Sequence, residues 1–427
     1  MYGHILSPET QAILLLCGRF NKVDTGNTAP LTLSEHNRLV KWLRGRKLSP
    51  AVFVQPEGED ILSENDLPME AERLRVLLGR GAALALIVEG WDNQGIWVVS
   101  RYDSEIYPQR LAALGGHAPP LLYGAGDPQL LSGGGIAVVG SRDADEEALE
   151  YTQSLVRTCA RHGIQVVSGG ARGIDSAAMQ TVLEAGGTAV GVLADSLGKT
   201  SLSGRYREAL MEKMLVLVSP YDPSSGFNVG NAMGRNKYVY ALADLGLVVS
   251  TSAGKGGTWE GALEALKKQY VYVRMNGSIP EGNRRLLELN ALAFPEPPWD
   301  DLAQVILGIN TKPLPSETVQ GNMNFEGVSV SPERPVEALK VMPLLKSVPR
   351  ENSITTAFDA VLPLLLEHLK QPRDVKSLAS SLDVRTEQVK DWIDIAVEKG
   401  QVAKQGKPVR YVAKNQEQSL FASDTAS

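Results

Sequence analysis

The chain has few of the residues that cross-link extracellular proteins, and it has no run that could span a membrane. Only two of its 427 residues are cysteines, Cys17 and Cys159, and their separation matches neither a disulfide framework nor a metal site. This usage is typical of a reducing cytosol. No apolar run approaches the roughly 20 residues of a transmembrane helix, and the amino terminus lacks a signal-peptide pattern. We therefore expect a cytoplasmic protein with no membrane contact.

An excess of positive charge is also missing. The 43 Lys and Arg residues are outnumbered by 49 Asp and Glu, which makes the net charge −6. Any binding of nucleic acid must therefore come from a local basic patch. The five histidines have no metal-like spacing, so we expect no metal ion and no cofactor.

A glycine-rich stretch, Val167-Ser-Gly-Gly-Ala-Arg-Gly-Ile-Asp175, is the most informative segment that is present. It lies between a β-branched run at 164–167 and an alanine-rich, helix-like run at 174–183. Glycines let a backbone approach a ligand closely, and a helix amino terminus offers unpaired N–H groups to an anion. The stretch therefore predicts a phosphate-binding turn.

Strand-like and helix-like runs alternate from residue 136 to about 294. The expected strands are 136–139, 164–167, 188–193, 215–218, 247–250 and 270–273. This alternation predicts an α/β fold with a doubly wound, parallel, Rossmann-like sheet, whose ligands bind at the carboxyl ends of its strands.

Composition suggests five segments. We expect an N-terminal accessory domain, mainly α, at 1–104, the Rossmann-like core at 105–309, a Pro-rich linker at 310–352, a winged-helix domain at 353–414 and a disordered tail at 415–427. Within the first segment the patterns predict helices at 9–16, 34–43 and 70–78, then β-like runs at 83–88 and 96–99.

The expected winged helix rests on helical patterns followed by two short β-like runs around a Gln-Gly-Lys-Pro turn. Its candidate recognition helix, 386–399, carries four acidic residues that would face phosphates poorly. We therefore favour a role in protein docking or oligomerisation over duplex recognition, although basic residues of the wing could touch a backbone.

Five basic residues follow or approach the predicted strand ends: Arg142, Arg172, Arg235, Lys237 and Lys255. In a doubly wound sheet they would converge at one edge and form an anion site despite the acidic chain. The alternative is that each one caps a helix or pairs with a nearby acid such as Asp143 or Asp175.

A second glycine loop, Gly254-Lys-Gly-Gly-Thr-Trp-Glu260, follows the fifth expected strand and opens a helix. Glu260 would cap that helix or accept a ribose hydroxyl. It could also act as a general acid or base on a glycosidic bond, if Arg172 or Asp175 lies within reach. Trp259 is more readily explained by packing than by stacking on a base.

Several short motifs, in order, resemble the DNA-processing protein A family (DprA/Smf). They are Tyr107-Pro-Gln-Arg-Leu111, Leu121-Leu-Tyr-Gly124, Ile136-Ala-Val-Val-Gly-Ser-Arg142, the loop at 168–175, Gly234-Arg-Asn-Lys237 and Gly282-Asn283. The resemblance covers about 104–295. It implies a homodimer built through the Rossmann-like domain, binding of single-stranded DNA, and help in loading the RecA recombinase during natural transformation.

The two loops and the resemblance together define a candidate phosphate-binding set. It comprises Gly140, Ser141, Arg142, Ser168, Gly169, Gly170, Arg172, Gly173, Arg235, Asn236, Lys237, Lys255, Gly256, Gly257 and Thr258.

Two segments depart from the family pattern. The loop at 256–260 is similar to that of nucleotide phosphoribohydrolases of the lysine-decarboxylase-like family, and 194–200 replaces a usual Tyr-Pro turn. Three hypotheses stay open: a non-catalytic single-strand binder, an N-glycosidic hydrolase that uses Glu260 and Arg172, and a nucleotide sensor in defence or regulation.

Overall fold

The computed structural model describes residues 6–20, 29–304, 306, 362, 365–382, 386–405 and 410–413. The chain divides into two compact units, Met1–Lys312 and Pro313–Ser427. The expected linker at 310–352 and tail at 415–427 lie outside the described residues. Across the described ranges, no helix is long and apolar enough to cross a bilayer.

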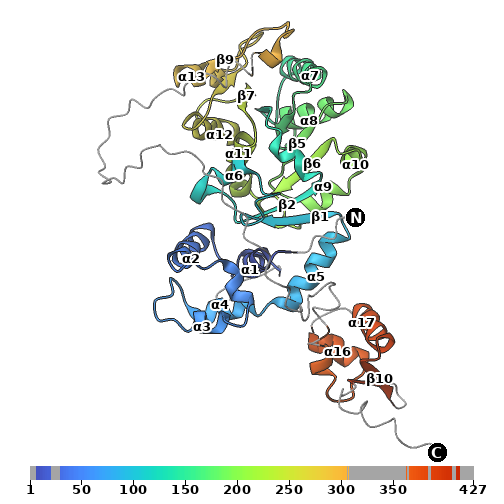
Figure 1. Ribbon diagram of the computed structural model, residues 1–427. Helices are drawn as coiled ribbons and strands as arrows, with labels where there is room; N and C mark the ends of the chain where they lie inside the picture. The colour runs from blue at the N-terminus through green and yellow to red at the C-terminus, as the bar shows by residue number, and fades with distance from the viewer. Residues whose placement is uncertain are drawn as a thin grey trace, which may run out of the picture. The chain divides into compact units, whose positions relative to one another are not determined.

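The first unit is built around one nine-stranded sheet with the order β1-β2-β6-β5-β4-β3-β7-β8-β9 (Figure 1). Its strands are β1 (Ile96–Ser100), β2 (Leu121–Gly126), β3 (Ile136–Gly140), β4 (Val166–Ser168), β5 (Ala189–Val192), β6 (Leu215–Ser219), β7 (Leu245–Ser250), β8 (Val271–Val273) and β9 (Leu292–Ala293). Strands β3 to β9 pair in parallel, whereas β1 with β2 and β2 with β6 pair antiparallel. All six expected strands are present, and the doubly wound parallel sheet is confirmed.

The order of the strands reverses at β3. The chain runs outward through β4, β5 and β6, then returns to the other side of β3 as β7. Loops that leave the carboxyl ends of β3 and β7 therefore diverge to opposite faces. In such sheets the crevice between the diverging loops is where ligands bind.

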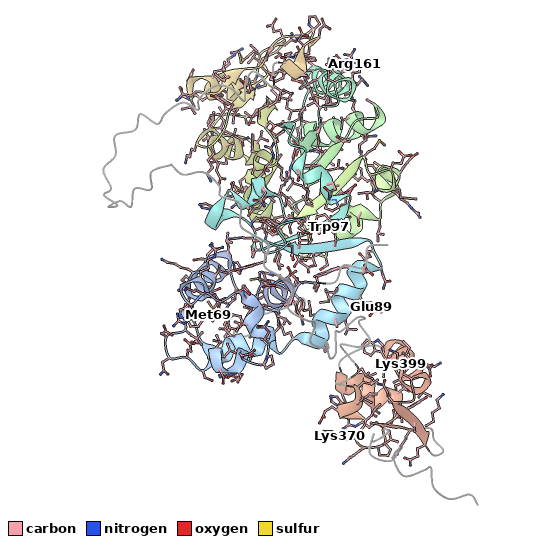
Figure 2. All side chains as sticks on the ribbon, viewed as in Figure 1. Met69, Glu89, Trp97, Arg161, Lys370 and Lys399 are labelled. Carbon is pink, nitrogen blue, oxygen red and sulfur yellow. The ribbon has the colours of Figure 1, made fainter. Side chains whose placement is uncertain are left out.

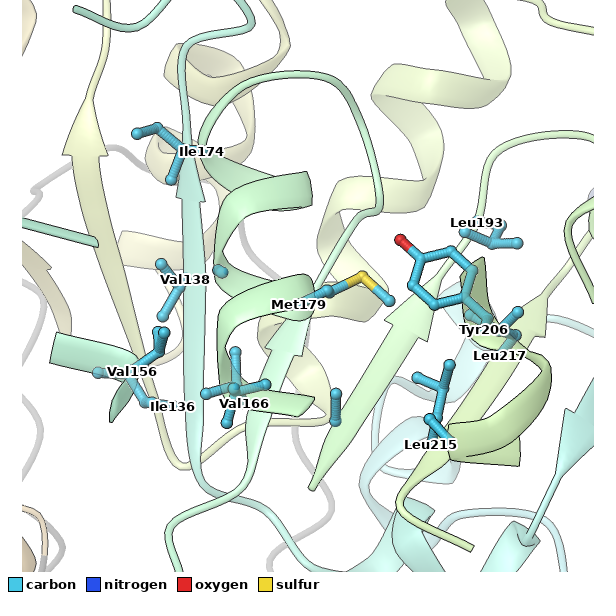
Figure 3. Close-up of a cluster of buried hydrophobic side chains, with 14 of the residues drawn as sticks. Ile136, Val138, Val156, Val166, Ile174, Met179, Leu193, Tyr206, Leu215 and Leu217 are labelled. Atoms are coloured by element: carbon cyan, nitrogen blue, oxygen red, sulfur yellow. The ribbon is translucent and has the colours of Figure 1, made fainter. Parts of the chain in front are cut away.

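Alternating residues of the strands face two separate cores. Ile136 and Val138 of β3 belong to one hydrophobic cluster, and Ala137 and Val139 belong to the other, as the two-residue period of a strand requires. Figure 3 shows part of the first cluster, in which the Met179 side chain points toward the ring of Tyr206.

Helices cover both faces of the sheet. The first core includes side chains of α7 (Glu146–Arg161), α8 (Ile174–Glu184) and α10 (Gly204–Met211), and a short helix α9 (Leu197–Ser201) precedes α10. The second core includes side chains of α6 (Gln109–Ala112), α11 (Val229–Ala241), α12 (Gly257–Leu266) and α13 (Glu281–Glu288). Short 3-10 turns η3 (Gly115–His117) and η4 (Pro128–Ser132) connect β1, β2 and β3.

The N-terminal helices form a third cluster that shares a helix with the sheet. It is formed by α1 (Pro8–Cys17), α2 (Leu33–Gly45), η2 (Pro50–Val54), α3 (Gly58–Leu62) and α4 (Ala71–Leu78). The buried Leu84 and Trp91 of α5 (Gly81–Asp92) belong to the first core of the sheet. Helix α1 is apolar around most of its circumference, as a helix buried on several sides must be. Its Leu14 packs in the first core of the sheet, and its Leu16 packs among the helices.

The antiparallel edge extends the sheet toward these helices. Trp97 of β1, labelled in Figure 2, donates from Nε1 to the Gly126 carbonyl at 2.9 Å. A Cβ at Gly124 would lie 2.2 Å from the Trp97 ring, so only glycine leaves room for the indole. The strand expected at 96–99 is therefore part of the large sheet.

The prediction of a β-like run at 83–88 is wrong, because the helix α5 spans these residues. Leu84 and Trp91, seven residues apart, are the buried side chains of this helix, and that spacing places them on one helix face. The segment is rich in alanine and leucine, and these helix formers outweigh the short Ile-Val pair. The three expected N-terminal helices at 9–16, 34–43 and 70–78 are confirmed.

In the second unit the structure describes α16 (Val375–Leu382), α17 (Thr386–Glu398) and a hairpin of β10 (Val402–Gln405) and β11 (Arg410–Ala413). Val389, Trp392, Ile393 and Ala396 are buried on one face of α17, as their spacing predicts. The winged-helix assignment itself stays a prediction.

Candidate functional site

A cavity of about 390 Å³ opens where β3 and β7 end, at the reversal of strand order described above. Nine of the fifteen expected residues line it. They come from the end of β3 and the loop after it, from α11, and from the loop after β7 with the first turn of α12: Gly140, Ser141, Arg142, Arg235, Asn236, Lys255, Gly256, Gly257 and Thr258. The sheet topology thus brings together segments more than 110 positions apart in the chain.

The loop after β7 presents a helix amino terminus to this cavity. Gly256 is the N-cap of α12 with φ of 94°, and α12 has no side-chain cap among the described residues. A residue with a Cβ rarely adopts this backbone conformation. Thr258 Oγ1 donates to the Gly140 carbonyl at 3.0 Å, which ties the two loops together. The first N–H groups of α12 are thus available to an anion.

Arg235 of α11 supplies a buried positive charge beside the cavity. The residue is 4% exposed, and its Nε and Nη1 have no hydrogen-bond partner among the described residues. The nearest carboxylate oxygen, Asp175 Oδ2, lies 3.9 Å from Nη1, beyond hydrogen-bond length. Burial lowers the pKa of Arg235, and the Asp175 charge opposes that shift. An anion that enters the cavity would offset the cost of this buried cation.

Gly169 leaves the space that the Arg235 side chain occupies. A Cβ built at Gly169 would lie 1.6 Å from Arg235 Nη1 and 2.5 Å from Asp175 Oδ2. No other residue type could stand there without moving the guanidinium. This glycine therefore acts by positioning Arg235 rather than by facing the ligand.

The rest of the first glycine loop is also engaged within the protein. Buried Ser168 donates from Oγ to the Val138 carbonyl at 2.7 Å, and the Ile174 N–H donates to the Ser141 carbonyl at 3.3 Å. Burial raises the pKa of Asp175, while Arg235 and the backbone of Gly140 lower it. Of this loop, Ala171 and Asp175 line the cavity, whereas Ser168, Gly169, Gly170, Arg172 and Gly173 do not.

Two of the basic residues expected at the site, Arg172 and Lys237, do not line the cavity. Arg172 is largely exposed and pairs with Asp143 on the loop after β3, which is the ion-pair alternative anticipated for it. Lys237 lies over the Tyr238 ring, with Nζ 5.1 Å from the centroid. Its neighbour Asn236 does line the cavity, and it donates from Nδ2 to the Gly257 carbonyl at 2.7 Å. Asn236 thereby holds the α12 loop against α11.

The cavity also has an apolar rim that the sequence motifs did not predict. Phe227, Val229 and Met233 line the cavity and are 57%, 65% and 43% exposed. The guanidinium of Arg142 lies 5.1 Å from the Phe227 ring centroid. In the sequence, an apolar residue recurs every few positions just before the Arg-Asn segment, and this pattern could have indicated the rim.

The core of the first unit is similar in sequence to a known protein family. Residues 98–299 match the family described as DNA recombination-mediator protein A. Over these residues, which carry the parallel core of the sheet, the chain is similar to this family. Protein Smf of Escherichia coli is 29% identical over 201 residues, which cover 46% of this chain and 53% of that protein. The chain spans about half the length of the curated relatives it matches.

Solved structures of two family members are similar to this chain. DNA processing protein A of Streptococcus pneumoniae is 20% identical with a TM-score of 0.48, covering 62% of this chain and 90% of that one. The Helicobacter pylori protein is 23% identical with a TM-score of 0.41, covering 50% of this chain and 94% of that one. The description of its structure concerns a single-stranded DNA binding mode.

Glu260 and Trp259 follow the glycines of the second loop but do not line the cavity. Glu260 is exposed in the first turn of α12 and is not one of the residues that line the cavity. Trp259 is buried in the second core of the sheet, which agrees with its expected packing role. Neither side chain contributes to the cavity surface.

Proposed function

We propose that the cavity binds phosphate groups of single-stranded DNA and that the chain is a non-catalytic DNA-processing protein. The observation that carries this proposal is Arg235, a nearly buried cation that lines the cavity with two N–H-bearing nitrogens unbonded among the described residues. The similarity of residues 98–299 to a family of recombination mediators agrees with it.

The charge balance of the cavity supports an anionic ligand. Three cations, Arg142, Arg235 and Lys255, line it together with two carboxylates, Asp143 and Asp175. Asp143 is already paired with Arg172 outside the lining. The positive end of α12 adds roughly half a unit charge. The cavity is therefore positive although the whole chain is negative.

The test is a fluorescence anisotropy titration of a labelled dT oligonucleotide with the full chain at low and physiological salt. We expect sequence-independent binding that weakens steeply with salt, because phosphate contacts release counterions. No binding at low salt by folded protein would refute the proposal.

A second candidate is a nucleotide-directed activity, either cleavage of the base-ribose bond or sensing in defence. The cavity volume favours it, since about 300–1,000 Å³ is typical of small-ligand sites. The exposed position of Glu260 outside the lining speaks against the hydrolase. Release of free base from nucleoside monophosphates that disappears in Glu260→Gln would favour it, and a thermal shift with cyclic or linear nucleotides would favour the sensor.

The proposal extends to features that the family resemblance implies. We place the protein in the cytoplasm as a homodimer built through the Rossmann-like core, with a RecA-type recombinase as partner and a winged-helix domain at 353–414 after a linker. Sedimentation of the full chain tests the dimer, and co-elution with purified recombinase on DNA tests the partner. Loss of DNA affinity on deletion of 353–427 would contradict the protein-docking role of that domain.

A further inference from the structure

The cavity is too small to hold several consecutive nucleotides of a DNA strand. Its volume of about 390 Å³ lies near the lower end of small-ligand sites. Domains that bind single strands along a groove contact about 4–16 nucleotides. A cavity of this volume therefore suits one nucleotide, and the rest of a strand would lie outside it.

The donors of the cavity suit a terminal phosphate. A phosphomonoester carries about −1.5 to −2 charges at pH 7 and three acceptor oxygens, whereas an internal phosphodiester carries one charge and two free oxygens. The lining offers Arg142, Arg235 and Lys255 together with the uncapped amino terminus of α12, and its two carboxylates are Asp175, which faces Arg235, and Asp143, which pairs with Arg172. Beyond Gly256 there is open space rather than protein. The cavity therefore has an excess of positive charge, which would hold a dianion better than a monoanion.

The apolar rim indicates that the phosphate belongs to a nucleotide. Phe227, Val229 and Met233 are exposed, and they lie around the same cavity as the cations. Single exposed apolar residues are common, but three on one rim offer a surface for a nucleobase. Inorganic phosphate would leave this surface unused.

We propose that the cavity holds a terminal nucleotide through its phosphomonoester, so that the protein prefers phosphorylated strand ends over internal positions. This inference rests on the proposed strand-binding function. The same chemistry could come from a 5′-phosphorylated end, a 3′-phosphorylated end or a free nucleoside monophosphate.

The experiment compares internally labelled dT strands by anisotropy with the full chain. One strand has a 5′-phosphate, one has a 3′-phosphate, and one is a nucleotide longer with hydroxyls at both ends, so that all three carry the same number of phosphates. We expect one phosphorylated strand to bind about tenfold tighter or better than the hydroxyl strand, as charge-assisted hydrogen bonds to the additional charge require. The tighter strand identifies the end, and thymidine monophosphate with its phosphate at the same position, 5′ (dTMP) or 3′, should displace it.

Lys255→Gln tests the cavity itself without burying a new group, because Lys255 is exposed. In this variant we expect the tighter phosphorylated strand to bind only about threefold better than the hydroxyl strand, or less. Lys267→Gln, at the exposed carboxyl end of the same helix, is the matched control and should keep the wild-type ratio.

Equal binding of all three strands would overturn the inference and leave the strand-binding function intact. Binding of dTMP without binding of any strand would refute that function and support the phosphomonoester site for a free nucleotide. Absence of binding by every phosphorylated probe would overturn both.

Discussion

Arg235 and Asp175 face each other inside the protein, with Nη1 3.9 Å from Oδ2 and side chains that are 5% and 9% exposed. Burial disfavours both charges, since it lowers the pKa of the guanidinium and raises the pKa of the carboxyl group, while each charge favours the ionised form of the other. The separation leaves donor nitrogens of Arg235 unbonded. The surrounding protein therefore holds the two side chains in place, and the positive charge of Arg235 stays available to a ligand.

Asp175→Asn should destabilise the fold by about 3 kcal/mol, because a buried charge that loses its partner is left uncompensated. Urea denaturation measures the change in the free energy of unfolding. Asp143→Asn is the matched control: Asp143 pairs with Arg172, but these side chains are 83% and 76% exposed, and such pairs contribute under about 1 kcal/mol. Equal losses in the two variants would contradict the buried role of Asp175.

Gly169→Ala should weaken oligonucleotide binding by about tenfold or more, because its Cβ would occupy the position of Arg235 Nη1. The side chain of Arg235 must then leave its place beside the cavity. Gly204→Ala is the control, since nothing lies within 4 Å of a Cβ at that position. Anisotropy titration measures binding, and thermal melting confirms that each variant is folded. Unchanged affinity in Gly169→Ala would show that the strand does not depend on Arg235.

Arg142→Ala should reduce the salt dependence of strand binding, because each lost phosphate contact lowers the slope of log affinity against log salt by about 0.7 for a single strand. Arg142 lines the cavity and lies over Phe227. The exposed Arg157 of α7 is the comparison, and Arg157→Ala should keep the wild-type slope. The same slope in all three proteins would place Arg142 outside the contact.

His36 should make the protein sensitive to acid. Burial, with Arg101 and Arg44 nearby, lowers the pKa of His36 from 6.5 to about 4. Between pH 6.5 and 4 the unfolded chain therefore binds a proton that the folded protein does not. The stability is fully present above pH 6.5, and up to about 3 kcal/mol is lost as the pH falls toward 4.

His36→Leu should remove this loss, and urea midpoints at pH 7.5 and 4.5 measure it. His162→Leu, at an exposed helix end, is expected to keep the wild-type pH dependence. An acid-induced loss of the same size in His36→Leu would assign the sensitivity to other groups.

The sequence by itself determined the parallel core of the fold. Apolar runs such as 136–139 and 215–218 are short, β-branched and separated by helical patterns, and local chain preferences therefore suffice to identify β3 and β6 and their neighbours. The faces of the sheet follow from the two-residue period. The antiparallel edge of β1 and β2 was not evident, because its pairing joins segments whose relation depends on the packing of Trp97 against Gly124.

Only the tertiary structure decided which of the candidate residues meet at one site. Both glycine loops have the composition of a phosphate turn, yet the first is engaged with Val138, Ser141 and Arg235, while the second opens a helix amino terminus into the cavity. Glycine spacing reports that a backbone can come close to something, and only the fold shows whether that neighbour is a ligand space or the protein's own arginine. For this reason Gly169 and Gly256, alike in the sequence, have different roles in the molecule.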